Sequence, residues 1–481
     1  MPNPYSKEEI NRSKSASIKD GAFWAISLGS GEASVQPFVV GLLNAGLDFT
    51  ILLTAVPPFI GSLAQFIATP ALTHLRSRRL FSTFVLMLQA LTWLCMAYLA
   101  VSGQPWAALA AVLVFTIYQV FNLLISPVWN VWMSEIVEHA ERGYYFALRN
   151  RIIVLLQLSV SLIAGWLLLQ SYVPIPLLFA GIFFVAFASR MVSGYFLGQM
   201  ADHPAAVEPH ESRLDLKTFI THPSYAEERH FSLYIFLLLT ATYLSSCFYA
   251  FYLLSVLHVD YFAFFLVILA APLAKFLTFP YWGRINDRYG TRALLYVSGL
   301  LVPLGPLIWF FTQNVGMLIF AEFIAGIAWS GFDLATFNYL LSHPNPGVRL
   351  TMSSVYTLGR GAGILLGSLI ALLLFTVWPQ AGIIGLGFFA AFFLLSALTR
   401  LLVSLSFLPL FSKTAFERQM QSNEFMFEVL AMRPTRDLSR NLVSTSVTGL
   451  HHAQSSMDFS RRMAQQGFER TVRLLRPMKK H

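Results

Sequence analysis

Three acidic residues lie inside long apolar runs of the sequence, where an unpaired charge is unfavourable. Glu32 stands about ten residues into a run from about 22 to 46, and Glu322 and Asp333 stand in a run from about 316 to 342. A charge at the centre of a bilayer costs at least about 2.5 to 3.5 kcal/mol on insertion scales, so such residues persist mainly beside a cavity or a partner. We expect these carboxyl groups to carry a proton or to bind a cationic group.

Small and polar residues surround Glu32 in the stretch GSGEASVQP. Helical spacing places Gly29, Glu32 and Gln36 on one face. Pro37 follows directly, and a proline inside a helix frees a backbone carbonyl one turn earlier and bends the helix. A bent helix with a polar face is typical of the wall of a substrate cavity. The alternative is that Glu32 is a structural group, either protonated or paired.

The second acidic run carries a stripe of residues spaced by four, three and four positions: Glu322, Gly326, Trp329 and Asp333. This spacing puts all four on one helical face. Glu322 and Asp333 are eleven residues apart, which is ~16 Å along a helix axis, so they do not share one proton directly.

Two cations also lie deep in apolar runs, Lys275 and Arg360. Lys275 could neutralise Asp333 or Glu322, or it could hold an anionic group of a substrate. We expect Arg360 to act as a second counter-ion for these carboxylates.

The residues around Arg360 have small-residue spacing, given by Gly359, Gly363 and Gly367. This spacing lets helices approach closely and favours helix packing over a phosphate-binding loop. Two further arginines, Arg190 and Arg400, lie near the ends of their runs. We expect their side chains to extend to the membrane surface.

The composition indicates an integral membrane protein. Of 481 residues, 12% are charged and 56% are hydrophobic, and the mean hydropathy is +0.61. Soluble domains have about 25% charged residues, so this chain cannot cover a water-soluble globule. Runs long enough to cross a bilayer occur at about 22 to 46, 50 to 73, 80 to 101, 106 to 128, 147 to 170, 174 to 199, 231 to 257, 260 to 282, 293 to 312, 316 to 342, 350 to 378 and 381 to 408.

The runs divide into six and six around a polar linker. We predict an N-terminal segment 1–20, a six-helix bundle 21–199, a linker 200–230, a second six-helix bundle 231–408 and a basic tail 409–481. The two halves share a proline-bounded pattern, SLAQFIATP ending at Pro70 and PLAKFLTFP ending at Pro280, 210 positions apart. A parallel repeat of this kind is one way in which secondary transporters are built.

Positive residues mark one set of connections. Alternate connections have no Lys or Arg, while the others contain Arg76, Arg78, Arg79, Arg142, Arg284, Arg288, Arg292 and Arg349. Basic connections face the cytoplasm in most membrane proteins. Both termini and the linker are therefore expected on the cytoplasmic side, and no cleaved signal peptide is expected.

One basic connection carries a family motif. GRINDRYGTR contains Gly283, Asp287, Arg288, Gly290 and Arg292. It resembles the signature loop of the major facilitator superfamily, in its second-half copy. The resemblance implies a tight turn formed by the glycines and a conformational latch formed by the carboxylate and the arginines. The first-half copy, PALTHLRSRR, lacks the acidic residue and both glycines, and we expect it to set orientation only.

A second motif, PVWNVWMSEIVEHAERGYYFALRNRI at 127–152, resembles the corresponding connection in a poorly characterised bacterial branch of the same superfamily. The residues of this predicted cytoplasmic gating cluster are Trp129, Trp132, Glu135, Arg142, Arg149 and Arg151. The tryptophans suit the headgroup level, and the charged residues could form an ion-pair cluster there. Plain anchoring of the helix end is the alternative.

The resemblance implies an all-α fold of twelve transmembrane helices in two pseudo-symmetric bundles. In that family the first, fourth, seventh and tenth helices line the central path, which places Glu32 and the acidic stripe on it. The fourth helix adds Tyr118 and Asn122. The alternative for these polar residues is hydrogen bonding between helices.

The function expected from these features is transport. We expect a monomeric secondary active transporter, not an enzyme, that moves a small organic solute by alternating access with proton coupling as a symporter, in the plasma membrane and, by the resemblance, in a bacterial inner membrane. An uncoupled facilitator is one alternative, and a scaffold or sensor that signals through its tail is another. No cofactor, metal or nucleic-acid partner is expected.

The tail is the remaining expected contact with the membrane. It has an excess of six positive charges, and Phe459, Met463, Val472 and Leu475 fall near one helical face. A basic amphipathic helix binds anionic lipid.

Overall fold

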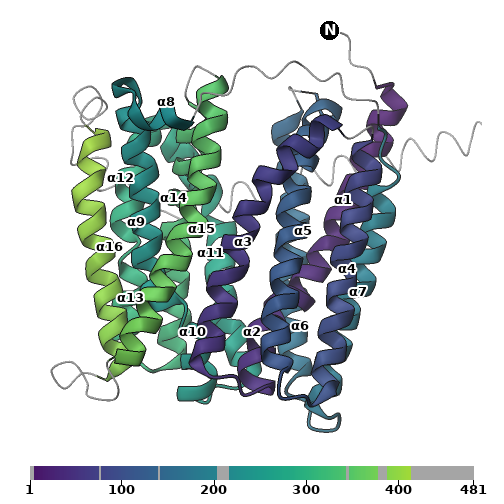
Figure 1. The fold of residues 1–481 in the computed structure, drawn as a ribbon, viewed down its shortest axis with the longest axis vertical. Helices are drawn as coiled ribbons and strands as arrows, with labels where there is room; N and C mark the ends of the chain where they lie inside the picture. Colours follow the sequence, from purple (N-terminus) through teal and green to yellow (C-terminus); the bar gives the residue numbers. More distant parts are fainter. Residues whose placement is uncertain are drawn as a thin grey trace, which may run out of the picture. The chain divides into compact units, whose positions relative to one another are not determined.

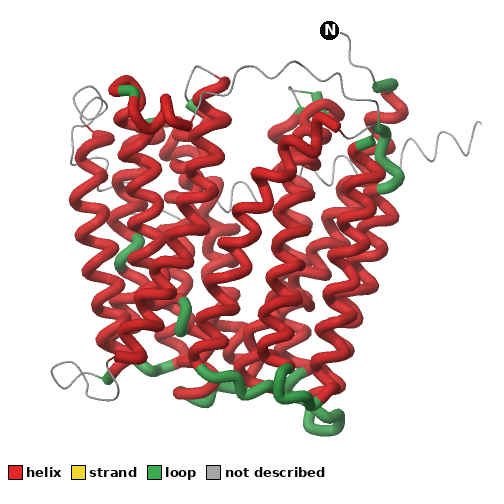
Figure 2. Tube along the Cα trace, viewed as in Figure 1, coloured by secondary structure: helices red, strands yellow, loops and turns green. Residues whose placement is uncertain are grey.

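The computed structural model describes residues 5–74, 77–138, 141–202, 216–342, 346–377 and 387–412. In these ranges the regular structure is helical and no strand occurs (Figure 2). The contacts gather Met1–Phe416 into one compact unit. The predicted tail beyond Ser412 lies outside the described residues.

The first half contains nine helical elements. Their bounds are α1 (Lys7–Ser27), η1 (Leu28–Glu32), α2 (Ala33–Pro37), η2 (Phe38–Leu42), α3 (Leu47–His74), α4 (Arg78–Ser102), α5 (Ala107–Ile136), α6 (Arg142–Leu167) and α7 (Ile175–Leu197). The elements η1 and η2 are π-helical turns.

The second half follows a short segment with α8 (Leu216–Thr221) and η3 (Pro223–Tyr225). Its elements are α9 (Ala226–Ser246), α10 (Tyr249–Phe251), η4 (Tyr252–Val256), α11 (Tyr261–Tyr289), α12 (Thr291–Leu301), α13 (Leu304–Phe311), α14 (Val315–Leu341), α15 (Pro346–Val377) and α16 (Phe388–Ser412). Figure 1 shows these helices running side by side, with the N-terminus and α8 at the same end.

Eleven helical segments of the described chain are long and apolar enough to cross a bilayer. The remaining expected span is the first, which is helical from Lys7 to Leu42 but is divided by the π-helical turns η1 and η2. The prediction of an all-helical, multi-pass membrane protein is confirmed, and the count of twelve is met approximately. The ninth predicted span is divided into α12 and α13, with Pro303 between them.

Two predicted connections are helical instead. Helix α11 continues to Tyr289, so Gly283 and Asp287 lie on the helix and not in a turn. The turn is made by Gly290 alone, whose φ of +84° is favourable for glycine. Helix α5 likewise continues to Ile136 and includes Trp129, Trp132 and Glu135. Both helices extend past the apolar run because charged and amphipathic side chains are tolerated where a helix leaves the hydrocarbon layer.

The two halves have the same pattern of helix packing. In the first half, α3 packs against α5, α4 packs against α5 and α7, and α1 packs against α6 and α7. In the second half, α11 packs against α14, α12 packs against α14 and α16, and α9 packs against α15 and α16. When the six spans of each half are numbered in chain order, the same numbered spans pack against each other in both halves. The structure therefore contains a parallel internal repeat.

The halves contact each other reciprocally, through α3 with α15 and α6 with α11. Each contact pairs the second span of one half with the fifth span of the other. Small residues occur at both: a Cβ added to Gly361 would lie 2.4 Å from Ser62 Oγ, and one added to Gly165 would lie 2.7 Å from Phe265 Cδ2. This exchange of equivalent surfaces is what a two-fold relation between the halves requires.

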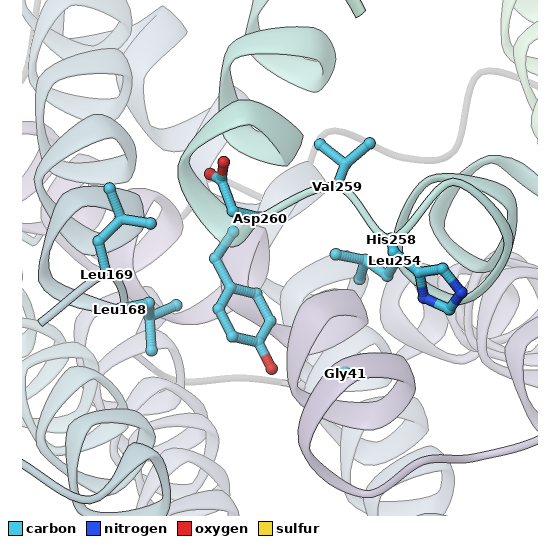
Figure 3. Close-up of a pocket in the computed structure, with 8 residues that line it drawn as sticks. Gly41, Leu168, Leu169, Leu254, His258, Val259 and Asp260 are labelled. Carbon is cyan, nitrogen blue, oxygen red and sulfur yellow. The ribbon is translucent and has the colours of Figure 1, made fainter. Parts of the chain in front are cut away.

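At the end remote from the N-terminus, an apolar cluster joins residues of both halves, among them Phe38, Phe179, Tyr252 and Phe264. Beside it is a cavity of about 410 Å³ (Figure 3). Its lining comes from the first half at Gly41, Leu168 and Leu169, and from the second half at Leu254, His258, Val259, Asp260 and Tyr261. The halves are thus in contact at this end.

Candidate functional site

Glycines bring the first span close to its neighbours. A Cβ added to Gly29 would lie 2.6 Å from the Gln157 carbonyl oxygen, and one added to Gly31 would lie 2.9 Å from the Trp93 ring. Only glycine fits such approaches. The close packing occurs in the π-helical turn that ends at Glu32, and π-turns inside helices often occur at functional sites.

Glu32 is bound by two neutral donors from α5. Tyr118 Oη donates to Glu32 Oε2 at 3.2 Å, and Gln119 Nε2 donates to Oε1 at 3.4 Å. The Tyr118 ring packs 4.5 Å from Trp93, measured between centroids. No ion pair of Glu32 occurs within the described ranges. Protonation of this carboxyl group would therefore break no salt bridge.

The other predicted residues near Glu32 are polar but more loosely connected. Gln36 Nε2 donates to Thr54 Oγ1 at 3.4 Å, which links the first span to α3. Asn122 lies one turn after Tyr118 on α5 and is half-buried. Their part in transport stays a prediction.

In the second half the structure brings together Lys275, Asp333 and Arg360, which come from α11, α14 and α15. Lys275 Nζ donates to Asp333 Oδ2 at 2.7 Å. Arg360 Nη1 lies 4.0 Å from Asp333 Oδ1 and donates to Tyr356 Oη at 2.6 Å. Two acidic partners were predicted for Lys275, and in the structure it pairs with Asp333.

Glu322 has separate partners. Trp309 Nε1 donates to Glu322 Oε1 at 3.0 Å, and the Trp309 ring stacks on Tyr249 with 4.3 Å between centroids. Gly326, on the same predicted stripe, contacts α11, since an added Cβ would lie 2.3 Å from the Ala271 carbonyl oxygen. Trp329 packs edge-on against Phe332, with 5.4 Å between centroids. The stripe therefore combines polar groups with a helix contact.

The prediction that Arg190 and Arg400 reach the membrane surface is wrong. Both are buried, with 4% and 2% of the residue exposed. Arg190 donates to Gln89 Oε1 at 2.8 Å and to Ser193 Oγ at 3.0 Å. Arg400 donates to the Thr242 carbonyl oxygen at 3.1 Å and to Ser396 Oγ at 3.1 Å. Both guanidinium groups donate to internal oxygens, which is how buried polar groups are stabilised away from water.

The predicted gating cluster is divided between two sites. Arg149 does not pair with Glu135. Instead it lies 3.5 Å from Asp20 Oδ2 and 4.2 Å above the Trp129 ring. Asp20 was not foreseen, because it stands only two residues before the first apolar run.

The remaining members of that cluster have other surroundings. Glu135 accepts a hydrogen bond from Arg78 Nη1 at 2.6 Å, and Trp132 Nε1 donates to the Ala201 carbonyl oxygen at 2.9 Å. Arg151 is exposed. The Arg142 side chain lies outside what the structure describes.

The predicted latch also has a different ion pair. Asp287 is exposed, and the Arg288 guanidinium lies 5.1 Å from the Tyr289 ring centroid. Arg292 Nη2 pairs with Glu227 Oε1 at 2.6 Å, and Tyr339 Oη donates to the same oxygen at 2.9 Å. This contact joins α9, α12 and α14 within one half.

A metal centre is not evident in the described part of the chain: no three His, Cys, Asp or Glu side chains there lie close enough to hold an ion. The groups assembled by the structure are those that handle protons and organic ions: carboxylates, phenols, amides and two half-exposed cations.

Comparisons with known proteins bear on the fold. No family model matches the chain, and no curated protein matches it. Among solved structures, a point mutant of the nucleoside transporter NupG is 14% identical, with a TM-score of 0.63, over 83% of this chain and 99% of its own. The POT family transporter PepTSo is 12% identical, with a TM-score of 0.64, over 86% and 99% of the two chains.

A third similar structure is a bacterial homologue of the iron transporter ferroportin in its inward-facing state. It is 14% identical, with a TM-score of 0.60, over 85% of this chain and 100% of its own. These likenesses cover nearly the whole of each transporter. The chain has the fold of major-facilitator-like transporters, and that prediction is confirmed.

Proposed function

We propose that the chain is a secondary active transporter that moves a small organic solute across a membrane by alternating access and couples this movement to protons. The observation that carries the proposal is the presence of polar groups in spans of opposite halves, Glu32 in the first and the Lys275–Asp333 pair in the second. Charged groups persist in spanning segments where they face a wet path or a partner. The fold supports the same class of function.

In this scheme the halves 21–199 and 231–408 rock against each other about the contacts of α3 with α15 and of α6 with α11. The small residues at these contacts, Gly361 and Gly165, favour sliding of one helix past another. Ion pairs near the N-terminal end, Arg78–Glu135 and Arg292–Glu227, lie within single halves. The contact of the two halves at the opposite end, through their shared apolar cluster, supports a conformation open toward the N-terminal end, which we assign to the cytoplasm.

Glu32 is our first candidate for the proton-carrying group. Its two hydrogen bonds come from neutral donors, so the carboxyl group can gain and lose a proton without competition from a bound cation. Glu322 and Asp333 are the alternates. The Asp287 and Arg288 latch and the Trp129 cluster are proposed to act at the cytoplasmic end.

The test uses proteoliposomes that contain a trapped pH-sensitive dye. Nucleosides, dipeptides, amino acids and sugars are added one at a time under an inward pH gradient. We expect at least one solute to accumulate together with proton entry. Glu32→Gln is expected to abolish accumulation above the outside concentration, while solute still moves down its own gradient.

The matched control is Glu138→Gln, an exposed carboxyl group outside the spans, which is expected to behave as wild type. Accumulation by Glu32→Gln at the wild-type rate would show that Glu32 does not carry the coupled proton. Solute movement indifferent to the pH gradient in the wild type would identify an uncoupled facilitator instead.

A scaffold or sensor is the candidate from another class. Removal of residues 413–481 separates the two functions, because the helices described for the transport unit end at Ser412. A transporter is expected to keep its solute flux without the tail. Loss of the cellular phenotype with unchanged flux would favour the scaffold.

A further inference from the structure

We propose that Lys275, Asp333 and Arg360 form a recognition site for an anionic group, a carboxylate or a phosphate, on the transported solute. The inference rests on the proposed transport function and deepens it, because it names the class of solute. Hereafter these three residues are called the triad.

The charges of the triad do not balance. One carboxylate lies between two cations, 2.7 Å from Lys275 Nζ and 4.0 Å from Arg360 Nη1. With ordinary ionisation the sum is one positive charge. A second anion at this place would complete the pairing.

The triad also has unused hydrogen-bond donors. Arg360 has five N–H groups, and the hydrogen bond it makes within the described ranges goes from Nη1 to Tyr356 Oη. Lys275 has three N–H groups, and one of them is used by Asp333. Planar guanidinium and mobile ammonium donors are the groups that bind carboxylate and phosphate in proteins.

Exposure distinguishes these two cations from the three buried arginines Arg149, Arg190 and Arg400. The side chains of Lys275 and Arg360 are each 40% exposed, whereas the Arg149 side chain is 7% exposed. Arg190 and Arg400 are buried as well, and carbonyl, hydroxyl and amide oxygens surround them. The buried arginines are structural, while the cations of the triad keep exposed surface on which a ligand can bind.

The exposed surface of the triad faces the interior of the protein. Lys275 is the central residue of α11, a depth at which a charge facing lipid would be strongly unfavourable. On α15, Gly361 faces α3, and Gly363 and Gly367 face α9. Arg360 turns instead toward Asp333 on α14. The triad therefore lies between α11, α14 and α15, the first and last of which also contact the first half through α6 and α3.

Asp333 then acts as an internal competitor. When no anion is bound, its carboxylate holds the two cations together. When an anion arrives, it takes donors from Lys275 and Arg360, and Asp333 gives up part of its pairing. Removal of the Asp333 charge should therefore strengthen anion binding, an effect that damage to the fold would not produce.

The experiment measures thermal stabilisation of the full chain in nanodiscs of phosphatidylcholine, which supply no anionic headgroup. The probes are matched pairs: lactate with lactamide, succinate with succinamide, and glycerol 3-phosphate with glycerol. We expect at least one anion to stabilise the protein while its neutral counterpart does not. For that anion, Lys275→Gln and Arg360→Gln should weaken binding about tenfold or more, because each removes charge-assisted hydrogen bonds.

Asp333→Asn should tighten binding of the same anion. The matched controls are Lys217→Gln and Arg12→Gln, at exposed cations outside the spans. These variants should leave the affinity for the anion unchanged. The inference is overturned if no anion stabilises the protein more than its neutral partner, or if Asp333→Asn weakens binding as the other two variants do. Transport of neutral solutes with no preference for anions would overturn this inference and leave the proposed transport function intact. Anion binding without any solute flux would support the anion site and contradict the proposed transport function.

Discussion

Asp20 has two partners inside the first half. Arg149 Nη2 lies 3.5 Å from its Oδ2, and Ser193 Oγ donates to its Oδ1 at 2.6 Å. Ser193 in turn accepts from Arg190. One carboxylate thus compensates two buried guanidinium groups on α6 and α7.

Loss of that compensation is expected to be severe. Asp20→Asn keeps the shape of the side chain but leaves two arginines buried without a carboxylate. Removal of one member of a buried ion pair costs about 3 to 5 kcal/mol, so we expect the free energy of unfolding to fall by about 3 kcal/mol. The measurement is a denaturant titration of the reconstituted protein.

Asp48→Asn is the matched control, since Asp48 is exposed in the first turn of α3. No ion pair of Asp48 occurs within the described ranges, and its charge lies in the first turn of α3, so the loss should stay below about 1 kcal/mol. Equal effects of the two variants would contradict the structural assignment of Asp20.

At the scale of helices, glycines on α15 decide how closely it approaches α9. A Cβ on Gly363 would lie 2.6 Å from the Phe236 carbonyl oxygen, and one on Gly367 would lie 2.2 Å from the Thr240 carbonyl oxygen. These obstacles are backbone atoms, which cannot rotate aside. The predicted small-residue pattern therefore works as a helix contact.

Gly367→Ala should force α9 and α15 apart. Overpacking of this kind costs about 1 to 3 kcal/mol, and we expect a lower midpoint of thermal unfolding. Gly181→Ala on α7 is the counterpart, because nothing lies within 4 Å of its added Cβ. That variant should keep or raise the midpoint, since alanine favours helix more than glycine does. A midpoint for Gly367→Ala equal to that of Gly181→Ala would show that the helices can separate without loss.

At the scale of the whole molecule, the repeat places equivalent groups in both halves. Arg190 and Arg400 are 210 positions apart, the same offset as Pro70 and Pro280, and both are buried on the last span of their half. The first spans of both halves also contain π-helical turns. The two halves are therefore alike in a buried arginine on the last span and in the π-helical turns of the first span, and they differ in Glu32 and the triad.

Orientation in the membrane gives a prediction for the whole chain. For this test Cys95 and Cys247 are replaced by serine, and one cysteine is introduced at a time. Ser171 lies in a connection without basic residues and Ser224 lies in the linker; both positions are exposed. An impermeant maleimide should label Ser171→Cys on intact cells and Ser224→Cys only after permeabilisation, because basic connections stay in the cytoplasm. The opposite labelling would place the basic connections outside.

The sequence was sufficient to predict the helices and the repeat, and it limited the acidic partners of Lys275 to Asp333 and Glu322. An apolar run of bilayer length has only the helix available, since every backbone polar group must be satisfied internally. The pairing of Lys275 with Asp333 was foreseen as one of two choices because few opposite charges lie in the spans. Glu32 was singled out because a charge deep in an apolar run persists mainly beside a cavity or a partner.

Tertiary structure decided which polar groups meet. Tyr118 and Gln119 bind Glu32 from 86 and 87 positions away, and Asp20 meets Ser193 across 173 positions. Helical periodicity fixes the face on which a side chain stands but not the rotation of that face against other helices. That rotation is set by glycine contacts and by packing among all the spans at once. It alone distinguished the buried arginines, which donate to internal oxygens, from the half-exposed cations Lys275 and Arg360.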